Sequence, residues 1–122
     1  MTAIQADEGR DNPLYIAMDA GRIDAGTTAA SAAVPCEGRR EAVILYTIDQ
    51  PHNRDVQMSD DGATWYVLVG GGLVLASPGA TGASANVERA LAIPLAGARF
   101  VRLTLTNTTG APATASVKVM LR

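Results

Sequence analysis

Alternation of apolar and polar residues is clearest near the end of the sequence. In residues 99–107, valine or leucine at 101, 103 and 105 alternates with arginine or threonine, and residues 115–121 show the same two-residue period. This period predicts two strands, each with one face in contact with water. The residues between them, Asn-Thr-Thr-Gly-Ala-Pro at 107–112, are typical of a turn. We therefore expect these two strands to form an antiparallel hairpin.

A second hairpin is predicted over residues 56–69. Its two halves are rich in β-branched and aromatic residues, and Asp61-Gly62 between them supplies residues that tolerate positive φ at a tight turn. Trp65 and Tyr66 then point to opposite faces of the sheet. We expect Trp65 in the core and Tyr66 on the surface.

Three further segments have the length and composition of strands. Residues 13–18 form the first, and the continuous apolar run at 42–48 predicts a central strand covered on both faces. Residues 87–95 form the third, in which Pro94 indicates an edge strand or a strand end. Three glycines at 70–72 are expected to end the strand that runs to residue 69, before an apolar stretch at 73–76.

Two other segments lack either period. Residues 1–12 are polar and predict an N-terminal arm that is ordered only if something holds it. Residues 19–38 are small and polar, and we expect a long connection with at most a short strand near Arg22-Ile23. Ordering a backbone costs about 1 to 2 kcal/mol per residue, so a segment with so few bulky apolar groups suggests contact with a partner chain.

Together these elements predict an all-β protein of about eight strands. An N-terminal arm at 1–12 is followed by a single domain at 13–122, which is expected to fold as an antiparallel β-sandwich of jelly-roll type. The alternation leaves the strand order open. The residues expected in the core are Val43, Leu45, Trp65, Val67, Val101, Leu103, Leu105, Val117 and Val119.

Composition narrows the possible partners. The 122 residues carry a formal net charge of −2, and Lys118 is the only lysine among ten basic residues. No basic tract follows the pattern of a nucleic-acid contact, and no apolar run reaches the length of a membrane span. Cys36 stands alone, so no internal disulfide forms, which fits synthesis in a reducing cytoplasm.

Neither nucleophilic nor metal chemistry is well supported. His52 and Cys36 are the only residues of their kinds, and no motif surrounds either. We expect a loop histidine, a buried thiol and no enzymatic activity. Four aspartates around one end of the second hairpin leave calcium binding open, although their spacing matches no known calcium loop; they are Asp49, Asp55, Asp60 and Asp61. No metal or cofactor is expected.

Arginine and tyrosine are the residues most suited to a protein interface in this chain. Arginine forms hydrogen bonds to carboxylates and carbonyls, and tyrosine supplies a large surface with a polar tip. The candidate partner-binding residues are Tyr15, Arg22, Arg39, Arg40, Tyr66, Arg99 and Arg102.

Two family resemblances go further than these patterns. Ser59-Asp60-Asp61-Gly62-Ala63-Thr64-Trp65, followed by Ala98-Arg99-Phe100-Val101-Arg102-Leu103, resembles the paired hallmark of discoidin-like, galactose-binding-type jelly rolls. That resemblance implies a carbohydrate-binding module. The first half of the chain departs from the pattern, because it is short and lacks aromatic and basic recognition loops.

The small Ala- and Thr-rich sandwich with an irregular arm also resembles accessory virion proteins of tailed bacteriophages, of the capsid decoration or cement type. That resemblance implies a structural virion protein, often a trimer, bound to the major capsid protein and made in the host cytoplasm. It is our first functional interpretation, and the carbohydrate-binding module is the alternative.

Overall fold

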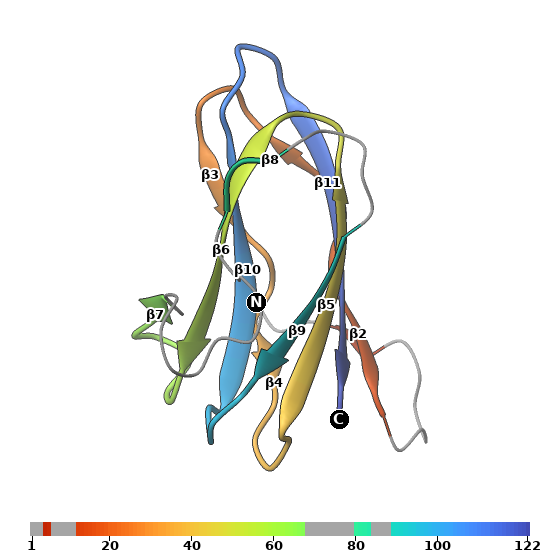
Figure 1. The fold of residues 1–122 in the computed structure, drawn as a ribbon, viewed down its shortest axis with the longest axis vertical. Helices are drawn as coiled ribbons and strands as arrows, with labels where there is room; N and C mark the ends of the chain where they lie inside the picture. Colours follow the sequence, from red (N-terminus) through yellow and green to blue (C-terminus); the bar gives the residue numbers. More distant parts are fainter. Residues whose placement is uncertain (1–3, 6–11, 68–79, 84–88) are drawn as a thin grey trace.

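Two antiparallel sheets face one another across an aliphatic core (Figure 1). In the computed structural model, residues 4–5, 12–67, 80–83 and 89–122 are described. The first sheet contains, in spatial order, β1 (Ile4–Gln5), β2 (Leu14–Ile23), β11 (Ala113–Leu121), β5 (Glu41–Ile48) and β9 (Arg89–Pro94). The second sheet contains β3 (Thr28–Ala30), β10 (Phe100–Asn107), β6 (His52–Ser59) and β7 (Tyr66–Val67), with β4 (Val34–Pro35) paired to β10 and β8 (Ala80–Ala83) paired to β6.

The strand order is that of a jelly roll. Within the described ranges, eleven strands are present, and three of them, β1, β4 and β7, have only two residues. The remaining eight (11 − 3) form the sheets β2-β11-β5-β9 and β3-β10-β6-β8, which interleave as two Greek keys. The predicted fold class, an antiparallel β-sandwich of jelly-roll type with about eight strands, is confirmed.

The alternating strands form the centre of the core. Leu103 and Leu105 of β10, like Val117 and Val119 of β11, have no exposed surface, and neither does Val101. The two-residue period predicted this burial, because it directs alternate side chains to one face of each sheet.

The predicted hairpin between these two strands is wrong. β10 belongs to the second sheet and β11 to the first, so residues 108–112 cross from one sheet to the other. Asn107 holds this crossing: its Nδ2 donates to Ile23 O at 3.2 Å and Ala111 O at 2.7 Å, and its Oδ1 accepts from Thr109 N at 3.0 Å. Two strands that each have one apolar face can bury those faces by pairing within a sheet or by facing each other across a sandwich. The period is the same in both cases.

β5 lies inside its sheet, yet only one of its faces is in the core. Ala42, Ile44 and Tyr46 are buried, whereas Val43 and Leu45 are only partly buried on the outer face. The prediction that this strand is covered on both faces, with Val43 and Leu45 in the core, is therefore wrong. In the described part of the chain, no second layer packs over the outside of this sheet.

The second predicted hairpin is present but is built differently. β7 pairs with β6, Tyr66 opposite Met58 and Val67 opposite Gln57, after a loop over residues 60–65 instead of a two-residue turn. Val67 is 44% exposed, and Trp65 lies outside the core, so both core predictions are wrong. Tyr66 is on the surface as expected. The predictions for residues 68–76 fall outside the described residues.

Residues 19–38, predicted as a long connection, are part of the fold itself. β2 continues to Ile23, and β3 and β4 both pair with β10. Ile23, Val34 and Cys36 are almost completely buried. The small side chains of this segment fit against the sandwich edge, and its backbone hydrogen bonds offset the ordering cost within one chain. The strand pairing and the burial of this segment both lie within one chain.

The edge strands of the first sheet are β1 and β9. Ile4 and Gln5 of the predicted arm pair with Ile16 and Tyr15 of β2, while the rest of residues 1–11 lies outside the described ranges. β9 is the opposite edge strand and ends at Pro94, as the proline predicted.

Candidate functional site

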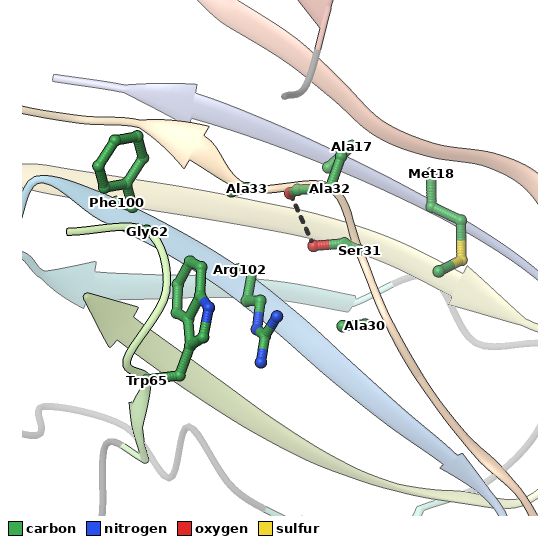
Figure 2. A pocket seen from close by; sticks show the side chains of 10 residues that line it. All are labelled: Ala17, Met18, Ala30, Ser31, Ala32, Ala33, Gly62, Trp65, Phe100 and Arg102. Atoms are coloured by element: carbon green, nitrogen blue, oxygen red, sulfur yellow. Dashed lines mark hydrogen bonds between the residues drawn. The ribbon is translucent and has the colours of Figure 1, made fainter. Parts of the chain in front are cut away.

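A groove of about 720 Å³ lies along one side of the sandwich (Figure 2). We call it the Arg102 groove. Its walls come from β2, from the end of β3 and the residues that follow it (30–33), from the loop at 60–65 and from β10. The lining residues are Ala17, Met18, Ala30, Ser31, Ala32, Ala33, Gly62, Trp65, Phe100 and Arg102.

A hydrogen-bonded loop forms one wall. Ser59 Oγ accepts from Gly62 N at 2.9 Å and donates to Asp61 Oδ1 at 3.0 Å. Asp61 Oδ1 also accepts from the backbone N–H groups of Ala63 and Thr64, both at 2.8 Å. These bonds stabilise the carboxylate and lower the pKa of Asp61 to about 2. They also fix the loop that carries Trp65.

Gly62 allows this loop to lie close to β10. Its φ is +76°, a conformation that glycine adopts without steric cost. A Cβ atom at this position would lie 3.5 Å from Phe100 Cε2. The loop therefore packs on the Phe100 ring. Trp65, later in the same loop, lies against Arg102, the next outward-facing residue of β10.

The guanidinium of Arg102 is held on two sides. Its Cζ lies 4.1 Å from the centroid of the Trp65 ring, and its Nε donates to Gln57 Oε1 at 2.7 Å. Arg102 and Gln57 are directly opposite each other in the β10–β6 ladder, so the strand register creates this bond. Figure 2 shows the indole and the guanidinium side by side at the groove.

This cation lacks a counter-charge in the described part of the chain. Ion pairs join Arg22 to Asp24 and Arg99 to Glu37, and Arg102 takes part in neither of these two. The bond from Nε is its one hydrogen bond to described residues, which leaves both terminal nitrogens as donors. Partial burial lowers the pKa of Arg102, although a guanidinium remains charged at any physiological pH.

The opposite wall is a backbone segment with very small side chains. Ser31 N donates to Leu103 O at 2.8 Å, and Ser31 Oγ accepts from Leu103 N at 3.0 Å. Ala32 N donates to Ala17 O at 2.8 Å and so ties the second sheet to the first. The wall is therefore fixed, and its alanines leave room beside the Arg102 guanidinium.

The structure brings only one of the candidate partner-binding residues, Arg102, to this groove. Tyr66 is 66% exposed and lies on β7, and Arg40 is exposed near the C-terminal Arg122. Tyr15 is partly buried against the core, which leaves less of it available to a partner. Arg22 and Arg99 are exposed and ion-paired, and Arg39 is partly buried. A binding role for these residues stays a prediction.

Sequence reasoning missed most of the groove. Trp65 was expected in the core, and Met18, Ser31 and Phe100 were not singled out. The Ser59-to-Trp65 motif was the available signal, because it fixes the loop that carries the indole. Residues 30–33 gave no signal, since alanines contribute to a groove only through their place in the fold.

Cys36 and His52 do not form a nucleophilic pair. Cys36 Sγ donates to Ala98 O at 3.4 Å, and burial raises the pKa of this thiol to about 11, which opposes thiolate formation. His52 is fully buried, with Nδ1 3.0 Å from Gln50 O and Nε2 2.9 Å from the Tyr46 hydroxyl. The expected buried thiol is present, but His52 begins β6 inside the core and is not a loop residue.

The four aspartates do not gather at one end of the hairpin, and that prediction is wrong. Asp49 precedes β6 and accepts from Thr114 N at 2.8 Å, whereas Asp60 and Asp61 follow the other end of the same strand. Among the described residues, no three His, Cys, Asp or Glu side chains form a group able to hold a metal ion. The described residues also contain no helix long and apolar enough to span a membrane.

Comparisons with known proteins identify the fold but no family. No protein-family model matches the chain, and no curated protein sequence matches it. Among solved structures, the VP2 subviral particle of infectious bursal disease virus matches over 99% of this chain, with a TM-score of 0.52 and 12% sequence identity. The Gt strain of the same virus matches with a TM-score of 0.50 and 9% identity. The chain spans only 36% to 37% of the length of these two proteins.

Proposed function

We propose that this protein is a structural component of a virus particle. The observation that carries the proposal is the jelly roll itself, which overlays over 99% of its length on a protein solved as part of a viral particle. In finer detail, we propose a capsid decoration or cement protein of a tailed bacteriophage, which binds the major capsid protein and stabilises the particle as a homo-oligomer, with a trimer favoured.

The outer face of the first sheet offers a surface for such assembly. The strand register aligns two rows of outward side chains across four strands. The rows are Leu14-Met120-Val43-Ala92 and Ile16-Lys118-Leu45-Ala90. The large apolar members are partly buried, and Lys118 is the one charged side chain among the eight. A partner placed on this face would remove apolar area from water, which is worth about 25 cal/mol per Å².

The small side chains of residues 19–38 do not by themselves indicate a partner. Residues 19–38 are ordered by their own chain, through pairing of β3 and β4 with β10. Support for assembly therefore comes from the fold and from the sheet face over which no described segment packs. Residues 1–12 remain a candidate contact with a neighbour.

A non-enzymatic role fits the burial of the single cysteine and the single histidine. Cys36 and His52, the residues best suited to nucleophilic catalysis, each have other hydrogen-bond partners. The pKa of the thiol is raised, not lowered, and this favours the unreactive form. Both residues are best understood as parts of the core.

Co-sedimentation with capsids of the source virus tests the proposal. The wild-type protein is expected to pellet with capsids and to have, by light scattering, a mass that is a multiple of 12.6 kDa. Leu45→Glu places a charge in the outer rows and is expected to weaken both properties. Thr47→Glu is the matched control on the same face of β5, where the side chain is already exposed. A monomer that ignores capsids would overturn the proposal.

A carbohydrate-binding module is the second candidate. The observation that favours it is the Arg102 groove, whose lining includes the aromatic side chains of Trp65 and Phe100. A glycan array distinguishes the two candidates: reproducible binding to a sugar that is lost in Arg102→Gln supports the module. Its absence, together with capsid binding, supports the virion protein.

A further inference from the structure

We propose that the Arg102 groove binds an acidic side chain of a partner protein, presented on an extended peptide segment. The proposal rests on the proposed function, since it names the chemistry by which a virion partner is recognised. It starts from the positive charge in the groove that has no counter-ion in the described part of the chain.

Arg102 is oriented before any ligand arrives. The Trp65 ring covers one face of the guanidinium at 4.1 Å, and Gln57 accepts from Nε at 2.7 Å. Its terminal nitrogens remain as donors at the groove. A planar guanidinium with two such donors matches the two oxygens of a carboxylate, and such bidentate bonds are shorter and stronger than neutral ones. Because the side chain is already fixed, less conformational entropy is lost on binding.

The wall opposite Trp65 leaves room for a peptide. Residues 30–33 are three alanines and a serine, and Ser31 is already bonded to Leu103. Their small side chains open a groove of about 720 Å³, large enough for several residues of an extended chain. Met18 and Phe100 add apolar surface at its ends, suited to small apolar neighbours of the acidic residue.

The geometry favours a peptide over an acidic sugar. Sugar sites commonly use an open aromatic face as a stacking platform, whereas the guanidinium of Arg102 occupies one face of Trp65. Trp65 is also the only tryptophan in the sequence, so no second indole is present to replace that platform. Glucuronic acid is therefore the competing ligand in the titration below.

Trp65 is the only tryptophan, so its fluorescence reports directly on the groove. The probe is the blocked pentapeptide Ac-Ala-Ala-Glu-Ala-Ala-NH2, compared with its Gln counterpart and with glucuronic acid, all titrated into the full-length protein. We expect a saturable change with the Glu peptide, at an affinity about five- to tenfold higher than for the Gln peptide. Equal affinities for the two peptides, or no change with either, would overturn the proposal.

Variants separate recognition from folding. Arg102→Gln is expected to remove the preference for Glu over Gln, and Arg102→Lys to retain part of it, because a lysine keeps the charge but loses the planar fork. Arg122→Gln is the matched control, since it removes an exposed charge outside the groove. Each variant must keep the wild-type circular dichroism spectrum. Tighter binding of glucuronic acid than of the Glu peptide would overturn the proposal and identify the ligand of the groove as an acidic sugar.

These titrations need no capsid. If the wild-type protein shows no Glu preference but still binds capsids, this inference is overturned and the proposed function stands. A retained Glu preference in a protein that ignores capsids would overturn the proposed function, while the groove would stay an acidic-peptide site.

Discussion

The hydroxyl of Tyr46 lies 2.9 Å from Nε2 of His52, and both side chains are buried between the two sheets. His52 Nδ1 lies 3.0 Å from Gln50 O, and a carbonyl oxygen can only accept a hydrogen bond. Nδ1 therefore carries the ring proton and donates to Gln50 O, and Nε2 accepts from the Tyr46 hydroxyl. Arg54 Nη1 donates to the same hydroxyl oxygen at 2.8 Å. A neutral histidine accepts from Tyr46 in this chain of hydrogen bonds, whereas a protonated one can no longer accept there.

The first prediction concerns pH. Burial, with smaller contributions from Arg89 and Arg54, lowers the pKa of His52 from 6.5 despite the bond to Gln50 O. As the pH falls below about 6.5, His52 takes up a proton in the unfolded chain but not in the native chain. The free energy of unfolding therefore decreases as the pH drops below that value. The slope is at most about 1.4 kcal/mol per pH unit for one group.

Urea unfolding between pH 7.5 and pH 5 measures this effect. His52→Gln preserves an acceptor for Tyr46 but cannot titrate, so its slope over this range is expected to be smaller. An identical slope in the variant would assign the pH dependence to other groups.

The second prediction compares two apolar residues. Leu103→Ala removes a fully buried side chain from the centre of β10 and is expected to cost about 2 to 5 kcal/mol of stability. Val43→Ala acts on the partly buried outer face of β5, and we expect a much smaller loss in the isolated protein. Chemical denaturation checks both. Equal losses would mean that another layer covers the outer face.

The third prediction concerns the crossing between the sheets. Asn107 has no exposed surface, and its amide serves Ile23, Thr109 and Ala111. Asn107→Ala leaves these backbone groups without that partner and is expected to cost about 1 to 3 kcal/mol. Thr108→Ala is a neighbouring control, because Thr108 Oγ1 makes only an exposed bond to Pro51 O. A loss at Asn107 no larger than at Thr108 would contradict the bridging role.

The fourth prediction concerns the loop that carries Trp65. Gly62→Ala forces an alanine to φ near +76° and is expected to cost about 1 kcal/mol and to shift Trp65 fluorescence. Gly97→Ala imposes the same kind of backbone strain at φ +85°, where a Cβ meets nothing within 4 Å. That control is expected to lose similar stability with unchanged fluorescence. Unchanged fluorescence in both variants would contradict the coupling of the loop to the groove.

The strands and the fold class were predictable because the two-residue period depends only on which side of a sheet a side chain takes. Leu103 and Val119 were assigned to the core for that reason. The partner of a strand is not encoded in this period, so the prediction that β10 and β11 pair with each other was wrong. Val43 was misplaced because a continuous apolar run occurs both in strands covered on two faces and in strands with one face partly exposed.

The groove was less predictable than the fold. The Ser59-to-Gly62 turn was visible, but the side chain of Trp65 stacks on Arg102 only because the loop is longer than a tight turn. Gln57 meets Arg102 through the strand register, which the sequence left open. Residues 19–38 were misjudged because backbone pairing, not side-chain volume, orders them.

Cryo-electron microscopy of the intact virion tests the central claim most directly. The account predicts density for this two-sheet domain on the capsid, in contact with the major capsid protein and repeated with the symmetry of the shell. A well-resolved particle without such density, from virions in which mass spectrometry also fails to find this chain, would contradict a structural role in the virus particle.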